Sequence, residues 1–124
     1  MILIDTSIWV DHFRRHHASL IELLETAQVC VHPYVIGELA CGSLKPRKNI
    51  LDSLVSMPTI QAASDAEVLF FVERHHLMGR GIGYVDIHLL AATAMHGSTR
   101  FWTHDKKLAA ISSELHLAYL EGKH

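Results

Sequence analysis

The chain has few cysteines, no long hydrophobic run and no excess of positive charge, and each shortage argues against a class of protein. Its two cysteines, Cys30 and Cys41, form no C-x-x-C or zinc-type pattern, so we expect two buried, reduced thiols and no disulfide scaffold. No apolar run approaches the roughly 18 residues that a membrane-spanning helix needs. The apolar start at Met1–Ile4 has no basic residue before it and is too short for a signal peptide, so a cytoplasmic protein is expected.

The formal net charge of −2 argues against a protein that holds nucleic acid by bulk positive charge. It leaves open a nuclease whose site is built from carboxylates, because a metal ion bound there brings its own positive charge to a substrate phosphate. With 124 residues, 49% of them hydrophobic and 19% charged, the chain has the size and composition of one globular domain covering residues 1–124.

Histidine, in contrast, is abundant, with eleven copies. A zinc or nickel site needs two or more histidines at fixed spacing with a matching third ligand, and neither an H-E-x-x-H motif nor a Cys/His set is present. We therefore expect these histidines on the surface and at helix ends.

Short apolar segments alternate with segments of helical periodicity. Strands are expected at Ile2–Ile4, Val29–Val31 and Arg100–Thr103, with minor strands in TIQA (59–62) and HLAYL (116–120). Helices are expected within 19–28, 34–42, 50–57, 64–76, 84–97 and 105–115, two of them opened by the capping-box patterns Ser19/Glu22 and Ser64/Glu67. This alternation predicts an α/β fold, a single α/β/α sandwich around a short, mostly parallel sheet.

Four of the thirteen acidic residues do not fit an ordinary place on a helix face or cap, although Asp105 could simply be the N-cap of the helix that starts near Lys106 and Asp86 could be only a first-turn acid. Asp5 directly follows a predicted strand and Asp105 comes just after another, and the carboxyl ends of parallel strands are where open α/β sheets bind ligands. Glu38 and Asp86 lie among apolar neighbours, where an unpaired carboxylate costs several kcal/mol or becomes protonated. By comparison, Asp11 is expected to be a charge at a helix start.

These four acids have no basic residue of their own to neutralise them. The lysines and arginines are concentrated elsewhere, at Arg14–Arg15, Lys45–Lys48 and Lys106–Lys107. Carboxylate oxygens that converge without a basic partner suit Mg²⁺, or Mn²⁺ as its substitute. The sequence therefore predicts a metal site made by Asp5, Glu38, Asp86 and Asp105.

The segments around these acids, read in order, carry a resemblance to a known family. They are MILIDTSIWVD around Asp5, ELACG around Glu38, GIGYVDIHLLAATAM around Asp86 and FWTHDKKL around Asp105. In these segments the chain resembles the PIN-domain nucleases, most closely the VapC-type toxins of bacterial toxin–antitoxin pairs, and the resemblance runs nearly from end to end.

The resemblance implies a metal-dependent endoribonuclease that hydrolyses RNA with metal-activated water and leaves 5′-phosphate and 3′-hydroxyl ends. It also implies that Asp5 and Asp86 are the principal metal ligands, that Glu38 and Asp105 complete the acidic pocket, and that Thr6, Ser7 and Thr103 support it. The partners that it implies are an RNA substrate, a small cognate antitoxin that masks the acids, and a second copy in a homodimer.

Two other classes of function remain open on the residues alone. A different metal-dependent phosphoryl-transfer enzyme could use Asp5 as its nucleophile, although an Asp-x-Asp pair would suit it better than the Ser7 found here. A non-catalytic binding module could use the acids to hold a structural ion. Lysines and arginines near the acids could hold RNA phosphates or simply be solvated. The two tryptophans, Trp9 and Trp102, are expected in the core.

Overall fold

A computed structural model describes residues 1–121 of the chain. Its sheet has three parallel strands in the order β2-β1-β3. The central strand β1 (Ile2–Ile4) pairs on one side with β2 (Val29–Cys30) and on the other with β3 (Arg100–Trp102). In register, Ile4 at the end of β1 lies opposite Trp102 at the end of β3, so these two strands stop at the same edge.

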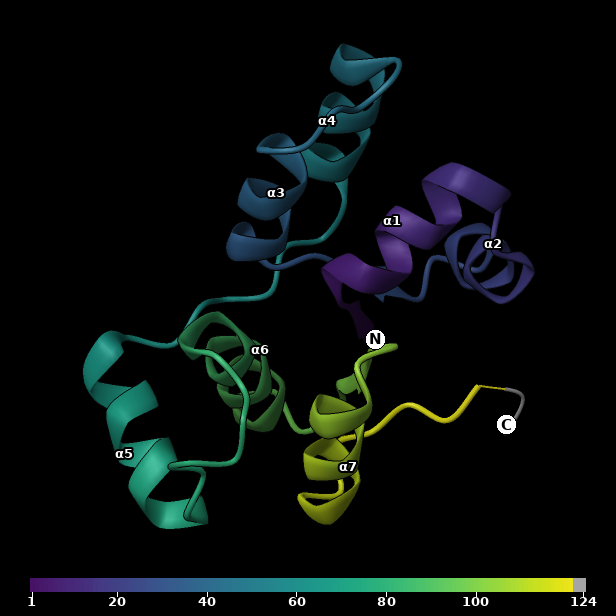
Figure 1. Cartoon of the computed structure of the whole chain (residues 1–124). Coiled ribbons are helices and arrows are strands. Elements are labelled where there is room, and N and C mark those ends of the chain that lie inside the picture. The colour runs from purple at the N-terminus through teal and green to yellow at the C-terminus, as the bar shows by residue number, and fades with distance from the viewer. Residues whose placement is uncertain (122–124) are drawn as a thin grey trace.

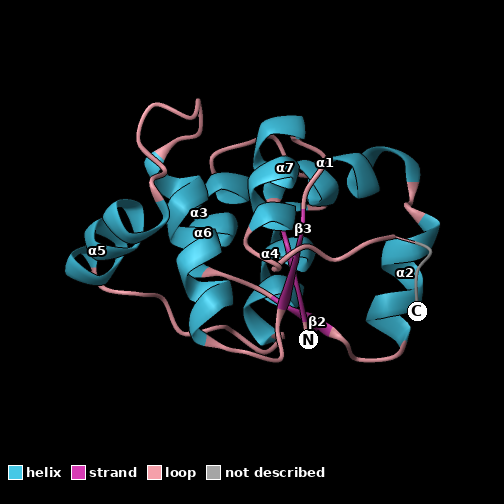
Figure 2. Ribbon diagram, turned by 90° about the horizontal axis from the view of Figure 1, so that it is seen from below, coloured by secondary structure: helices cyan, strands magenta, loops and turns pink. Residues whose placement is uncertain are grey.

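Helices follow or connect the strands. They are α1 (Thr6–Arg15), α2 (Ala18–Glu25), α3 (Pro33–Ala40), α4 (Arg47–Ser56), α5 (Asp65–His75), α6 (Tyr84–Met95) and α7 (Lys106–Glu114). Helices α1 and α2 lie on one side of the strands, and α5 and α6 lie on the other (Figures 1 and 2). This arrangement confirms the predicted α/β/α architecture with a short parallel sheet. None of the helices in the described part of the chain is long and apolar enough to cross a membrane.

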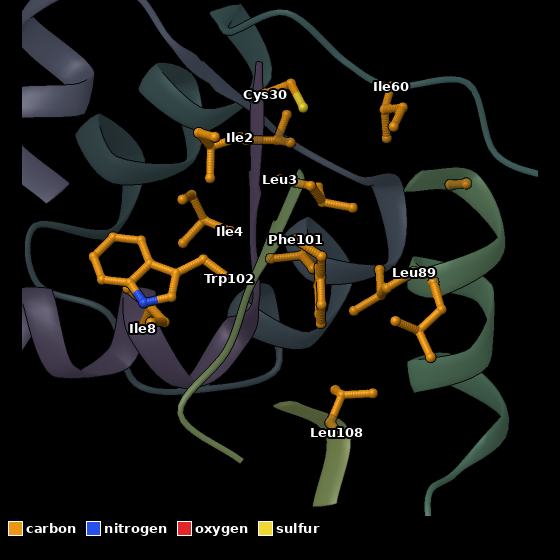
Figure 3. Close-up of a cluster of buried hydrophobic side chains, with 14 of the residues drawn as sticks. Ile2, Leu3, Ile4, Ile8, Cys30, Ile60, Leu89, Phe101, Trp102 and Leu108 are labelled. Carbon is orange, nitrogen blue, oxygen red and sulfur yellow. The ribbon is translucent and has the colours of Figure 1, made fainter. Parts of the chain in front are cut away.

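The core forms on both faces of β1 and β3. Leu3 and Ile4 are fully buried at 0% exposure, which is possible because neighbouring residues of a strand point to opposite faces and both faces are covered by helices. Figure 3 shows Ile4 and Trp102 on one side of the strands and Phe101 facing Leu89 of α6 on the other. The strands therefore read as continuous apolar runs, and their ends are held rigidly.

The predicted minor strands shrink to single bridges. Thr59 pairs with Val31, and Ala118 pairs with Phe101, both in parallel orientation.

The capping box at Ser64 is confirmed, with both of its reciprocal hydrogen bonds to Glu67.

The predicted capping box at Ser19 is wrong. Helix α2 already has His17 at its N-cap, so Ser19 lies inside the helix. The Ser19 hydroxyl donates instead to Glu121 Oε1 at 2.8 Å.

The structure also tests the expectations for the tryptophans, the cysteines and Asp11. Both tryptophans are buried, as expected, at 2% exposure for Trp9 and 4% for Trp102. Of the two free cysteines, Cys30 is buried but Cys41 is exposed, because Cys41 caps the end of α3. Asp11 does not start a helix, since α1 begins at Thr6 and carries Asp11 in its middle.

The histidines divide into two groups. Several stand at helix ends, as expected: His16, His17, His76 and His96 are cap residues. His32 also caps a helix, but both it and His88 are buried, at 0% and 1% exposure, so neither is a surface residue. They lie edge to face around Tyr34, which fills the space beside both rings.

Candidate active site

Three of the four predicted acids stand at the beginnings of helices. Asp5 is the N-cap of α1, and Asp105 is the N-cap of α7, where its Oδ1 accepts from the Leu108 backbone N–H at 2.9 Å. Asp86 occupies the first turn of α6, and its Oδ2 accepts from the Gly83 N–H at 3.1 Å. The positive ends of three helix dipoles therefore stabilise these carboxylates, which is one reason why they persist without basic partners.

Asp5 is the buried centre of the candidate site. It is 7% exposed and lies where β1 ends, with its backbone N–H bonded to the Trp102 carbonyl at 2.9 Å. Its Oδ1 accepts from the Thr6 N–H at 2.8 Å, while its Oδ2 accepts from the hydroxyls of Thr103 at 2.6 Å and Ser7 at 3.2 Å. These bonds fix the carboxylate on rigid elements of the fold.

Burial raises the pKa of Asp5 above its usual value, because the ionised form loses its hydration. The hydrogen bonds from Thr103, Thr6 and Ser7 lower this pKa, and the negative charge of Asp86 raises it. The influence of Asp86 shows that the structure brings this second acid, 81 positions further along the chain, into electrostatic range of Asp5.

Glu38 joins the site through one hydroxyl. Thr6 Oγ1 donates to Glu38 Oε1 at 2.7 Å, while the backbone N–H of the same threonine bonds Asp5. Glu38 itself is exposed, which corrects the expectation that its apolar neighbours bury it. Val35 and Leu39 are buried, and at 100° per residue both lie to one side of Glu38, so the carboxylate stands at the margin of the buried face of α3 and reaches solvent.

Asp105 joins the site through Thr103. The Thr103 hydroxyl donates to Asp5 and accepts from the Asp105 backbone N–H at 3.0 Å. In the same way, Ser7 Oγ donates to Asp5 and accepts from the His104 N–H at 3.2 Å. The three hydroxyl residues that sequence reasoning singled out thus bond Asp5 to the segments that carry Glu38 and Asp105.

The four acids meet no basic side chain within 4.0 Å anywhere in residues 1–121, where three ion pairs of Arg or Lys and three His–carboxylate contacts involve other acids. All of their donor atoms are oxygens, and an ion-free buried carboxylate next to a second acid is an unfavourable arrangement that a cation relieves. The donor set therefore fits Mg²⁺ or Mn²⁺.

The spacing of the four acids bears on how a metal ion would bind. Within residues 1–121, one group of three residues has ligand atoms that all lie within 4.8 Å of one another. It consists of Asp11, His17 and His104 and includes none of the four acids. The acids are thus spaced more widely than ligands that bind one ion directly. Mg²⁺ tolerates such spacing because it retains several of its waters.

The sequence did not predict the grouping of Asp11 with His17 and His104. The excess of histidine was the available signal, but the three residues have no recognisable spacing.

A groove of about 440 Å³ adjoins the site. Its lining includes Thr6 and Glu38 and the basic residues Arg14 and Lys45. Two other basic residues that were candidates for RNA contacts have partners within the protein. Arg47 donates to the Ala40 and Gly42 carbonyls at the end of α3, and Lys48 pairs with Asp52 at 2.7 Å.

Comparison with known proteins adds to this geometry. The model of the PIN domain family matches residues 2–114, which span all four acids. The chain belongs to the PIN-domain family. This confirms the resemblance seen in the sequence.

A near-full-length relative places this PIN domain more closely. Ribonuclease VapC32, found in two strains of Mycobacterium tuberculosis, is 45% identical over 121 residues, which cover 98% of each chain. This PIN domain is therefore of the VapC ribonuclease type. That membership favours a nuclease over the two alternative classes that the residues alone left open.

Solved structures agree on the fold. PAE2754 from Pyrobaculum aerophilum superposes with a TM-score of 0.65 at 16% identity, covering 95% of this chain and 87% of that one. FitAcB from Neisseria gonorrhoeae gives a TM-score of 0.60 at 17% identity, covering 91% and 94%. FitAB bound to an IR36 DNA fragment gives 0.62 at 15% identity, covering both chains completely. At these identities the likeness concerns the fold alone.

Proposed function

We propose that this VapC-type PIN domain, over residues 1–124, is the endoribonuclease toxin of a toxin–antitoxin pair and that its active site is the acidic edge around Asp5. The observation that carries the proposal is the state of Asp5. It is a buried carboxylate with three hydrogen-bond donors, a second acid in electrostatic range and no basic partner in the described residues. A buried carboxylate that is fixed in orientation, faces a second acid and has no basic partner suits the binding of a cation.

The proposed cofactor is Mg²⁺, with Mn²⁺ as substitute, held chiefly by Asp5 and Asp86 with help from Glu38 and Asp105. When bound, such an ion supplies positive charge to a phosphodiester and increases the acidity of water. The protein's own part is positional. Thr103, Ser7 and the Thr6 N–H hold the Asp5 carboxylate in one orientation, and the Thr6 hydroxyl holds Glu38 beside it.

The substrate in this proposal is RNA that enters along the groove beside Glu38. Arg14 and Lys45 line the groove and are free to contact backbone phosphates, unlike Arg47 and Lys48, whose side chains are bonded within the protein. Lys106 and Lys107 at the start of α7 are exposed next to Asp105 and extend the positive charge along the other side of the acids.

The cognate antitoxin, a homodimer and a cytoplasmic location are further parts of the proposal. The groove is the proposed place for the antitoxin because a segment bound there would cover Glu38 and Thr6. Exposed apolar side chains on α5 and α6, among them Leu69, Phe70 and Met95, are the surface that we propose for a second copy. Light scattering of the purified protein at several concentrations tests the dimer directly.

The decisive experiment incubates the purified protein with structured RNA in Mg²⁺, in Mn²⁺ and in EDTA. We expect cleavage with either ion, none in EDTA, and a loss of at least about 100-fold in Asp86→Asn, because an amide is a much weaker ligand than a carboxylate for a hard cation. Asp52→Asn is the matched control, since Asp52 is an exposed acid on α4 that pairs with Lys48 and is not one of the four acids of the site.

Cleavage that persists in EDTA and in Asp86→Asn would overturn the metal mechanism. A folded protein that cleaves no RNA under any of these conditions would favour the binding-module alternative. Induction of the chain in bacteria adds a cellular readout, because growth should stop with the wild type and continue with Asp86→Asn.

A further inference from the structure

A second group of metal-ligating side chains lies beside the acidic edge. It consists of Asp11 from the middle of α1, His17 from the turn between α1 and α2, and His104 from the connection between β3 and α7. One ligand atom from each residue lies within 4.8 Å of the other two. None of these side chains belongs to the carboxylate site proposed above.

The backbone holds His17 firmly in this place. His16 ends α1 in the left-handed conformation with φ 52°, and this turns the chain so that His17 comes back toward Asp11. The His17 N–H donates to His12 Nδ1 at 3.1 Å, and its ring packs edge-on against Trp102 with the ring centres 5.1 Å apart.

His104 reaches the group from the other side. Its N–H is bonded to Ser7, and its exposed ring lies with its centre 5.7 Å from that of His17. His104 Nε2 is 3.8 Å from Asp11 Oδ2, which is too long for a hydrogen bond. Asp11 Oδ1 is used by Arg15 at 3.0 Å, so Oδ2 is the oxygen that faces the histidines.

The ring of His17 lacks the partners that a half-buried imidazole normally has. Its Nδ1 is buried and makes no hydrogen bond in the described part of the protein, and its Nε2 is 3.9 Å from Glu121 Oε1. A buried ring nitrogen without a partner is a cost that a structural histidine would avoid. A metal cation that accepts the lone pair of such a nitrogen would satisfy it.

We propose that Asp11, His17 and His104 form a site for a transition-metal ion of the Zn²⁺ type, with the fourth position left to water. Two imidazole nitrogens and one carboxylate oxygen are the donor set that Zn²⁺ takes in proteins, whereas Mg²⁺ prefers oxygen ligands alone. The carboxylate site and this site therefore differ in the metal that they select.

The geometry needs only a small side-chain adjustment to close. Ligand atoms around a tetrahedral Zn²⁺ are roughly 3.3–3.5 Å apart, given metal–ligand distances of roughly 2.0–2.2 Å. The 3.8 Å between His104 and Asp11 is close to that value, and the exposed ring of His104 is free to rotate. A filled site would link α1, α2 and the segment that carries Thr103 and Asp105.

The test measures Zn²⁺ binding in the Asp86→Asn background, in which the acidic edge is weakened and no RNA cleavage is needed as a readout. Thermal unfolding with one equivalent of Zn²⁺ should rise by several degrees. A further His104→Ala change should remove this rise and weaken Zn²⁺ binding by at least the roughly 10–100-fold that loss of an outer-shell partner already costs. Co²⁺ as a probe should give the visible absorption of a four-coordinate ion only when His104 is present.

His75→Ala in the same background is the matched control, because His75 is a histidine of α5 that does not belong to the group. Asp11→Asn provides a second ligand change that leaves both histidines in place. Equal Zn²⁺ stabilisation in the His104→Ala and His75→Ala proteins would overturn the proposal, since it would mean binding by scattered surface histidines. The nuclease proposal would be unaffected by that outcome.

Discussion

Thr103 and Asp5 lie 98 positions apart in the chain, yet the Thr103 hydroxyl donates to Asp5 Oδ2 over 2.6 Å. The contact exists because β1 and β3 are parallel neighbours that stop together, so the residue after each strand meets the residue after the other. This bond is the shortest of the three that orient the Asp5 carboxylate, and it is the one that also ties Asp105 to the site.

Replacing Thr103 by Val should therefore affect catalysis through Asp5. The hydrogen bond favours the ionised carboxylate, so its loss should raise the pKa of Asp5 further. We expect RNA cleavage to fall about tenfold or more, with the rising limb of the pH–rate profile moved to higher pH. Thr103→Ser retains the hydroxyl and should restore both the rate and the limb. If the rising part of the pH–rate profile lies at the same pH in Thr103→Val as in the wild type, this role of Thr103 is contradicted.

Asp5 itself should limit the stability of the metal-free protein. Because folding raises the pKa of Asp5, the folded state holds the proton more tightly than the unfolded state, and ionisation lowers the free energy of unfolding. In EDTA, at a pH where Asp5 is ionised, we expect Asp5→Asn to unfold a few degrees above the wild type. The advantage should vanish as the pH falls through the folded pKa.

Calorimetry in Mg²⁺ completes that experiment. Mg²⁺ should raise the unfolding temperature of the wild type and leave Asp5→Asn unchanged, since the variant has lost its principal ligand. The Asp52→Asn protein should behave as the wild type in both buffers. A variant that is less stable than the wild type in EDTA would show that the Asp5 charge is not a cost to the fold.

Much of the site could be predicted from the sequence because its positions follow strand ends. Asp5 and Asp105 come after apolar strands of a parallel sheet, and that topology alone brings them to one edge. The exposure of Glu38 could not be predicted, because the face of α3 that is buried depends on how α3 packs against other elements. Local apolar composition was misleading there.

The histidine group was unpredictable for a different reason. It depends on the left-handed backbone of His16, a non-glycine residue, which turns the chain between α1 and α2. It also depends on strand pairing, which places His104 beside Ser7. Neither the turn nor the register leaves a pattern of spacing that a reader of the sequence would recognise as a ligand set.

The capping box of α5 gives a prediction about stability alone. Ser64 accepts from the Glu67 N–H at 3.1 Å, and Glu67 accepts from the Ser64 N–H at 2.8 Å. Ser64→Ala should lower the free energy of unfolding by about 1 kcal/mol, measured by urea denaturation, while RNA cleavage stays unchanged. Ser53→Ala, an exposed serine within α4, is the control and should have little effect.

His32 should make the protein sensitive to acid. Burial, and secondarily His88, lowers the pKa of His32 from 6.5 to about 4, so the folded state keeps the ring neutral. Between pH 6.5 and about 4, the unfolded state binds a proton at His32 and the folded state does not. The free energy of unfolding should therefore decrease as pH falls from 6.5 to about 4, by an amount on the order of 3 kcal/mol in full.

His32→Asn isolates this contribution. His32 Nδ1 accepts from the Tyr34 N–H at 3.0 Å as the N-cap of α3, and Asn is a good N-cap that does not titrate in this range. Urea denaturation of both proteins from pH 4 to pH 8 should show a flatter pH dependence in the variant, whatever its stability at pH 8. Because Asp5 titrates in both proteins, the difference between the two curves belongs to His32. Parallel curves would assign the acid sensitivity to other groups.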